Sequence, residues 1–149
     1  MRRGGSEDAA DIARLLHDFN TEYDDPTPGV PVLAERVSEL LSDEEIVVLL
    51  AGKPPAGLAL FRIRPSLWSR AADVYLEELY VVPERRGHGV GRALLEAAIE
   101  AAREAGADHF ELTTGETDTE ARGLYESRGL TNREGGPDGP RMLYYELDL

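Results

Sequence analysis

The chain has no cysteine, and this absence excludes several kinds of chemistry together. Without a thiol there is no disulfide framework, no thiolate zinc site and no cysteine nucleophile for a covalent relay. The three histidines, His17, His88 and His109, are too scattered along the chain to form a metal-ligand cluster. We therefore expect no metal site.

Long apolar runs are also missing. No run approaches the ~20 residues that a membrane-spanning helix requires. The basic start of the chain, residues 1–5, is not followed by the apolar segment of a signal peptide. The expectation is a cytoplasmic protein without a membrane partner.

Positive charge is scarce. The chain has 16 Lys and Arg residues against 29 Asp and Glu residues, which gives a formal net charge of −13. This balance disfavours a nucleic-acid partner, because such binding depends on basic residues that neutralise phosphates. The acid excess either keeps the surface soluble or attracts cationic partners, and both explanations stay open.

What is present suits one domain over residues 1–149, since 42% of the residues are hydrophobic. Apolar residues at helical spacing predict four helices, over residues 7–22, about 31–42, 90–105 and about 118–128. Short apolar runs predict strands over residues 46–51, 56–64, 74–82, 108–113, 130–133 and 141–149, with a short first strand over residues 1–4.

The order of these elements predicts an α/β (α+β) fold. The segment from 74 to 113 reads strand, helix, strand, which is a right-handed parallel crossover, whereas the other strands follow one another as hairpins. We expect a mixed, mostly antiparallel twisted sheet flanked by helices, in the order β-α-α-β-β-β-α-β-α-β-β.

In the strand over residues 74–82, the alternation of apolar residues changes phase. Its apolar positions before Glu77 share one face, and those after Glu78 share the other. One extra residue in a strand re-aims the side chains that follow it, so this phase change predicts a β-bulge. Two adjacent acids therefore lie at the expected bulge.

A glycine-rich segment follows this strand directly after Pro83. Residues 85–91 read RRGHGVG, and a helix begins at once. Backbone amides in such a turn, with the positive end of a helix dipole behind them, form a cradle for an anion. The spacing does not match the dinucleotide fingerprint G-x-G-x-x-G, and the segment lacks the Lys-Ser or Lys-Thr of a P-loop.

The segment resembles the pyrophosphate-binding signature of the GNAT superfamily of acyl-CoA-dependent N-acyltransferases, through Arg86-x-x-Gly89-x-Gly91. Residues 75–83 are similar to the family's fourth strand. Residues 118–130 resemble its second cofactor motif, N-x-x-A-x-x-L-Y-x-x-x-G-F, although Asp118 replaces the asparagine and Leu130 the phenylalanine. The predicted order of elements also matches the family's.

The resemblance implies acetyl-CoA or another acyl-CoA as the cofactor. The strand would offer backbone groups to the pantetheine arm, and the glycine-rich amides would hold the pyrophosphate. The implied cofactor-binding residues are Leu79, Tyr80, Val81, Arg85, Arg86, Gly87, His88, Gly89, Val90, Gly91, Arg92, Asp118 and Tyr125.

The resemblance also implies catalytic roles. The Tyr125 hydroxyl, with an ordinary pKa of ~10, would protonate the departing thiolate, although Tyr125 could instead be a core residue. An ammonium acceptor must lose a proton before it attacks, and Glu77 or Glu78 would take it. We expect one of the two acids to pair with Arg62 or Arg64. Glu77 is the preferred base, and Glu78 is the alternative.

The expected activity is direct acetyl transfer from acetyl-CoA to a primary amine of a small cationic molecule, such as a polyamine, an aminoglycoside or an amino acid. Acids and aromatic residues suit a cation, so the loop after the first helix and the Trp68 loop should meet at the acceptor site. The substrate-binding candidates are Tyr23, Asp24, Trp68 and Glu77. A protein N-terminus or lysine as acceptor, and an acyl-CoA sensor without turnover, are the alternatives. A homodimer is a further expectation, because many members of the family dimerise.

Overall fold

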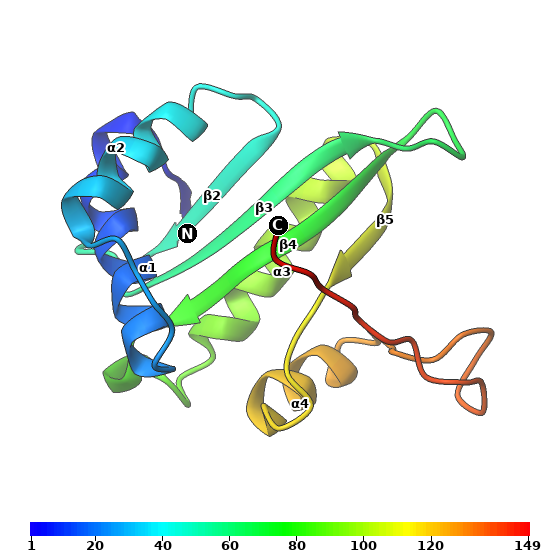
Figure 1. The fold of residues 1–149 in the computed structure, drawn as a ribbon. Helices are drawn as coiled ribbons and strands as arrows, with labels where there is room; N and C mark the ends of the chain where they lie inside the picture. The colour runs from blue at the N-terminus through cyan, green and yellow to red at the C-terminus, as the bar shows by residue number, and fades with distance from the viewer. The chain divides into compact units, whose positions relative to one another are not determined.

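The computed structural model describes residues 1–149 (Figure 1). It divides into two compact units, Met1–Leu112 and Thr113–Leu149, and each is described by itself. A single domain over residues 1–149 therefore stays a prediction. None of the helices combines the length and apolar character needed to cross a bilayer.

A five-stranded sheet organises the first unit, with its strands in chain order. Every neighbouring pair is antiparallel except the last, in which β4 and β5 run parallel. The strands are β1 (Arg2–Arg3), β2 (Ile46–Ala51), β3 (Gly57–Pro65), β4 (Ala72–Val81) and β5 (Ala107–Leu112). This confirms the predicted mixed, mostly antiparallel sheet.

Helices lie on both faces of this sheet. The helical elements of the unit are η1 (Ser6–Asp8), α1 (Ala9–Glu22), α2 (Val30–Leu40), η2 (Pro83–Arg85) and α3 (Val90–Glu104). Helix α3 makes the parallel crossover from β4 to β5, and Figure 1 shows it running along the sheet. The predicted helices over residues 7–22, 31–42 and 90–105 are confirmed to within a few residues.

The two faces have separate cores. On one face, α1 and α2 pack on alternate residues of β2, β3 and β4, in a buried cluster that includes Ile12, Leu15, Val37, Val48, Leu50, Leu58, Leu60 and Tyr80. On the other face, α3 buries Leu94, Leu95, Ala98 and Ala102. Gly57 lies on this second face, because a Cβ there would stand 3.1 Å from Leu94 Cδ1 and 3.3 Å from Val81 Cγ2.

The predicted bulge in β4 is present. Leu60 of β3 pairs with Glu78, and the next residue, Phe61, pairs with Leu76, so Glu77 is the extra residue. After the bulge, Leu79 pairs with Ala59, and the apolar residues on both sides of the bulge face α3. Glu78 consequently shares the opposite face with its partner Leu60, at the edge of the core under α1 and α2.

The second unit contains one helix, α4 (Thr119–Ser127). Its N-cap is Asp118, whose Oδ1 accepts a hydrogen bond from the Ala121 amide at 3.0 Å. The helix predicted from the motif over residues 118–130 is therefore confirmed, and Gly129 follows it with a φ of 96°.

The strands predicted over residues 130–133 and 141–149 are not formed. A turn of glycine and proline brings Arg133 and Arg141 into a single antiparallel bridge, and the pairing stops there. Alternating apolar residues become a strand only beside a partner strand, and this unit supplies none. The apolar side chains after the bridge are left exposed, namely Met142, Leu143, Tyr144, Tyr145, Leu147 and Leu149.

Candidate functional site

The glycine-rich segment joins the end of β4 to the start of α3, and we call residues 85–91 the glycine loop. Gly87 and Gly89 have φ angles of 73° and 80°, in the left-handed region that favours glycine. No atom lies within 4 Å of where a Cβ would stand at either residue, so the loop is open on that side. Gly89 is the N-cap of α3. The first amides of a helix have no acceptor within the helix, so this loop can hold an anion such as a pyrophosphate.

The two arginines of the glycine loop have different surroundings. Arg85 is exposed. The Arg86 guanidinium instead donates to both carboxylate oxygens of Glu22, at 2.6 and 2.7 Å, and its Nε donates to the Val81 carbonyl oxygen at 2.9 Å. The hydrogen bonds from Arg86 lower the pKa of Glu22 from its ordinary value. His88 is exposed, and its Nδ1 donates to the Arg86 carbonyl oxygen at 2.7 Å.

The two acids of the β4 bulge are also unlike each other. Glu77 forms an ion pair with Arg62 of β3, which confirms that one of the two acids pairs with a neighbouring arginine. Glu78 is half-buried and has no cationic partner. Burial raises its pKa to about 7, and the negative charge of Glu77 adds to the shift. At neutral pH, Glu78 is therefore a carboxyl group that can both take up and release a proton.

The remaining predicted residues of β4 lead from these acids to the glycine loop. Tyr80 and Val81 are buried, and Leu79 is half-buried. Burial raises the pKa of Tyr80 to about 12, and the Glu22 carboxylate contributes. The Tyr80 hydroxyl donates to Glu22 at 3.2 Å, so it is not available as an acid for another group.

The α1–α2 loop, residues 23–29, starts beside the end of β4. The Tyr23 ring packs edge-on against Phe19 with centroids 5.3 Å apart, and Phe19 stacks on Tyr80 at 5.1 Å. Asp24 and Asp25 are exposed, and Asp24 has a φ of 58°. Tyr23 and Asp24 thus lie at the same end of β4 as the glycine loop.

Trp68 lies elsewhere, and the expectation that its loop meets the α1–α2 loop is wrong. The β3–β4 hairpin pairs Pro65 with Ala72 at one end and Gly57 with Val81 at the other. Trp68 is in the connection after Pro65 and is 91% exposed. The ten residues of β4 span roughly 30 Å, so Trp68 and the glycine loop are at opposite ends of the strand.

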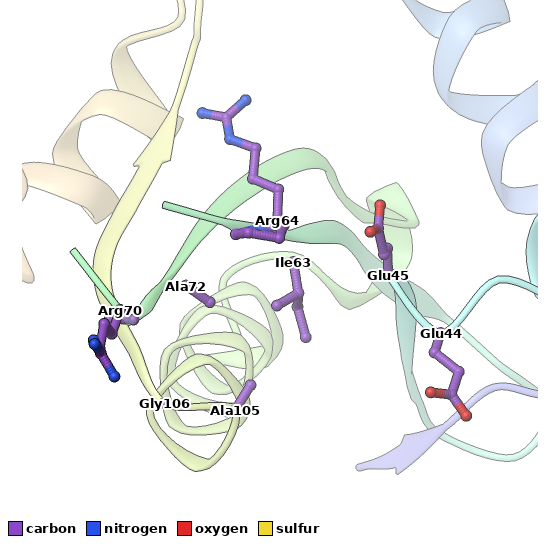
Figure 2. A pocket seen from close by; sticks show the side chains of 10 residues that line it. Glu44, Glu45, Ile63, Arg64, Arg70, Ala72, Ala105 and Gly106 are labelled. Carbon is purple, nitrogen blue, oxygen red and sulfur yellow. The ribbon is translucent and has the colours of Figure 1, made fainter. Parts of the chain in front are cut away.

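A shallow hollow of about 470 Å³ lies at the Trp68 end of the sheet (Figure 2). Figure 2 shows Ile63, Ala72 and Ala105 at its centre, with the Arg64 and Arg70 side chains extending outward. It adjoins the C-terminal end of α3, a helix of 15 residues and thus roughly 22 Å long. This hollow is therefore separate from the glycine loop at the other end of α3.

Asp118 and Tyr125 belong to the second unit. Asp118 uses its carboxylate as the N-cap of α4. Tyr125 is half-buried on the same helix, and burial, together with the Asp118 charge, raises its pKa to about 12. Its hydroxyl is consequently protonated throughout the neutral range.

The contact between Glu22 and Arg86 is a feature that the sequence did not reveal. The two residues are 64 positions apart. Neither the acidic end of α1 nor the arginine before Gly87 indicates its partner. The pair forms only because α1 packs on the face of β4 that carries Tyr80.

The comparisons with known proteins agree on one family. The model of the acetyltransferase (GNAT) family matches residues 10–130. An uncharacterized N-acetyltransferase of Archaeoglobus fulgidus is 39% identical over 74 residues, which are 50% of each protein, so the match spans half the length of that relative. The thialysine N-epsilon-acetyltransferase of Bos taurus is 33% identical over 157 residues, covering 91% of this chain and 87% of that protein.

A solved structure extends the likeness to the fold. A candidate acetyltransferase from Arthrobacter sp. FB24 is 50% identical, with a TM-score of 0.91 over 99% of this chain and 94% of that one. The family match includes β4, the glycine loop and α4, which are the segments that carry the predicted motifs. On this evidence, the chain belongs to the GNAT acetyltransferase family.

Proposed function

We propose that this protein transfers an acetyl group from acetyl-CoA directly to a primary amine of a small cationic molecule, with Glu78 as the general base. One observation carries the proposal: a half-buried carboxylate without a cationic partner, with a pKa of about 7, lies on the strand that leads into the glycine loop. General bases work best when their pKa is near the operating pH.

The residues fit the cofactor through the glycine loop. The left-handed glycines leave the loop open, the amides of Gly87 to Gly91 would bind the pyrophosphate, and the exposed Arg85 adds positive charge. Beside it, β4 offers the backbone of Leu79 to Val81 to an extended pantetheine arm. When bound, acetyl-CoA supplies an acyl group that is already activated as a thioester.

Glu78 is better suited to the base role than Glu77. The Glu77 carboxylate is already engaged in an ion pair with the Arg62 guanidinium. Glu78 has no such partner, and the neighbouring negative charge increases its basicity. Glu78 would accept the proton that a primary ammonium, with an ordinary pKa of ~10.4, must lose before attack.

The general acid would be Tyr125. Its hydroxyl holds a proton at neutral pH and would deliver it to the leaving sulfur.

The acceptor is proposed to be cationic for two reasons. Tyr23 and Asp24 present an aromatic ring and a carboxylate at the glycine-loop end of β4. The formal net charge of −13 favours the approach of cations. The bovine relative is named for an amino acid substrate, thialysine, which supports an amino acid among the candidate amines. A panel of amino acids, polyamines, aminoglycosides and peptides, assayed for thiol release, identifies the acceptor.

Replacing the proposed base should abolish most of the turnover. We expect Glu78→Gln to lower kcat by ~10²-fold or more, because general bases typically contribute that much. The affinity for CoA, measured by calorimetry, should stay within about twofold of wild type. A variant that keeps more than about a third of the wild-type kcat would exclude Glu78 as the base.

Thermal unfolding provides the control for this variant. The pKa of Glu78 is raised in the folded state from 4.5 to about 7, so its ionised form opposes folding. This cost is absent below pH 4.5 and grows as the pH rises to about 7. Glu78→Gln should therefore have a higher Tm than wild type at pH 8 and nearly the same Tm at pH 4.5, which separates lost chemistry from lost folding.

The pH profile tests the interaction of the two acids. In the wild type, kcat/KM should rise with pH and level off above a midpoint near 7, as Glu78 loses its proton. Glu77→Gln removes a negative charge and frees Arg62, and both changes lower the pKa of Glu78. The midpoint should move to lower pH with the same acceptor. Glu111→Gln, which breaks the ion pair with Arg64, is the matched control and should leave the midpoint in place. A midpoint that rises in Glu77→Gln contradicts the assignment.

Tyr125→Phe separates an enzyme from an acyl-CoA sensor. If Tyr125 is the acid, kcat should fall by on the order of 10²-fold while CoA affinity is kept. Tyr145→Phe, at an exposed tyrosine of the same unit, should change neither quantity. If the wild type binds acetyl-CoA but acetylates no amine of the panel, the sensor replaces the enzyme. If only peptides are acetylated, the protein acts on protein N-termini or lysines.

The homodimer stays a prediction from the family resemblance. It would cover the exposed apolar side chains of Met142, Leu143, Leu147 and Leu149. Sedimentation equilibrium should then return twice the chain mass of 16.4 kDa at micromolar concentration, and a single chain mass would exclude it.

A further inference from the structure

An ion pair joins two segments of the first unit that are 64 positions apart. Glu22 is the last residue of α1, directly before the α1–α2 loop, and Arg86 stands directly before Gly87. Two parallel hydrogen bonds of 2.6 and 2.7 Å connect them in the bidentate geometry of a strong pair. The Arg86 side chain is 33% exposed and the Glu22 side chain is 29% exposed, so the pair is partly shielded from water.

Further contacts fix this pair in place. Arg86 Nε donates to the Val81 carbonyl oxygen at 2.9 Å, and the guanidinium carbon lies 5.6 Å from the centroid of the Tyr80 ring. The Tyr80 hydroxyl donates to Glu22 at 3.2 Å, and Phe19 stacks on the same ring. Each of the three nitrogens of the guanidinium therefore has an acceptor. Its orientation is set by α1 and β4.

The two arginines of the glycine loop, Arg85 and Arg86, therefore have different roles. Arg85 is exposed, whereas the charge of Arg86 is balanced by Glu22. A neutralised guanidinium attracts an anion far less than an exposed one. The contribution of Arg86 is then mechanical, because it ties the start of the glycine loop to the end of α1.

We propose that Glu22 and Arg86 are a positioning pair that holds the glycine loop in its anion-binding shape and couples it to the α1–α2 loop. This inference rests on the proposed function, in which the two loops bind acetyl-CoA and the amine. Because Glu22 directly precedes the α1–α2 loop and Arg86 lies at the start of the glycine loop, order in either loop stabilises order in the other. Coupling of this kind is reciprocal, so each ligand should increase the affinity for the other.

The test measures CoA affinity by calorimetry and the acceptor KM by steady-state kinetics. Glu22→Gln should weaken CoA binding and raise the acceptor KM, each by about 10-fold, while kcat changes little. Tyr80→Phe, which removes only the hydroxyl that supports Glu22, should shift both quantities in the same direction by a smaller factor. In the double variant Glu22→Gln with Arg86→Gln, CoA binding should be no weaker than in the worse single variant, because both remove one interaction.

Two controls separate positioning from simple charge. Arg85→Gln should weaken CoA binding and leave the acceptor KM unchanged. Glu39→Gln breaks the exposed pair with Arg36 on α2 and should change neither value. If Arg86 instead binds the pyrophosphate and Glu22 competes for it, Glu22→Gln should tighten CoA binding, and the inference is overturned. An unchanged acceptor KM in Glu22→Gln also overturns it. A wild type that binds no CoA refutes the proposed function itself.

Discussion

The extra residue in β4 is the constraint on which the rest of the first unit depends. Without the bulge, strict alternation would turn the apolar residues after Glu78 away from α3. With Glu77 inserted, Leu79 and Val81 return to the face that α3 covers, and the crossover helix can pack along the whole strand. The same insertion places Glu78 on the face of Tyr80, beside the edge of the α1 and α2 core. One backbone irregularity therefore completes the core and supplies the unusual carboxylate.

This arrangement has an energetic cost that packing alone does not explain. A half-buried carboxylate without a cation opposes folding at neutral pH, and Arg62 relieves the charge of Glu77 only. A second arginine close to Glu78 would remove the cost, but it would also make the carboxylate a weak base. Perturbed acids of this kind are typical of functional sites, where basicity is kept at the expense of stability.

The bulge and the glycine-rich turn could be predicted from the sequence, because the residues that indicate each of them are close together in the chain. The phase change around Glu77 predicted the bulge, and the glycine-rich segment predicted the turn directly before α3. The errors concern long-range pairing. Trp68 was expected at the acceptor site from its residue type, but the register of the β3–β4 hairpin places it at the far end. The strand predicted over residues 141–149 has the right alternation and lacks a neighbouring strand.

The choice between Glu77 and Glu78 also depended on tertiary structure, since only the packed sheet shows that Arg62 pairs with Glu77.

The remaining question is how a chain with a formal charge of −13 would hold the anionic cofactor that we propose for it. The acidic excess opposes a site that is built from exposed basic side chains, because the long-range field repels the ligand. A cradle of backbone amides avoids this difficulty, since its partial charges act only at short range and are fixed in direction by the helix. The Glu22–Arg86 pair adds no net charge to the glycine loop, and we propose that it holds the loop in its anion-binding shape. In the function that we propose, the glycine loop therefore acts as a preorganised set of dipoles more than as a basic patch.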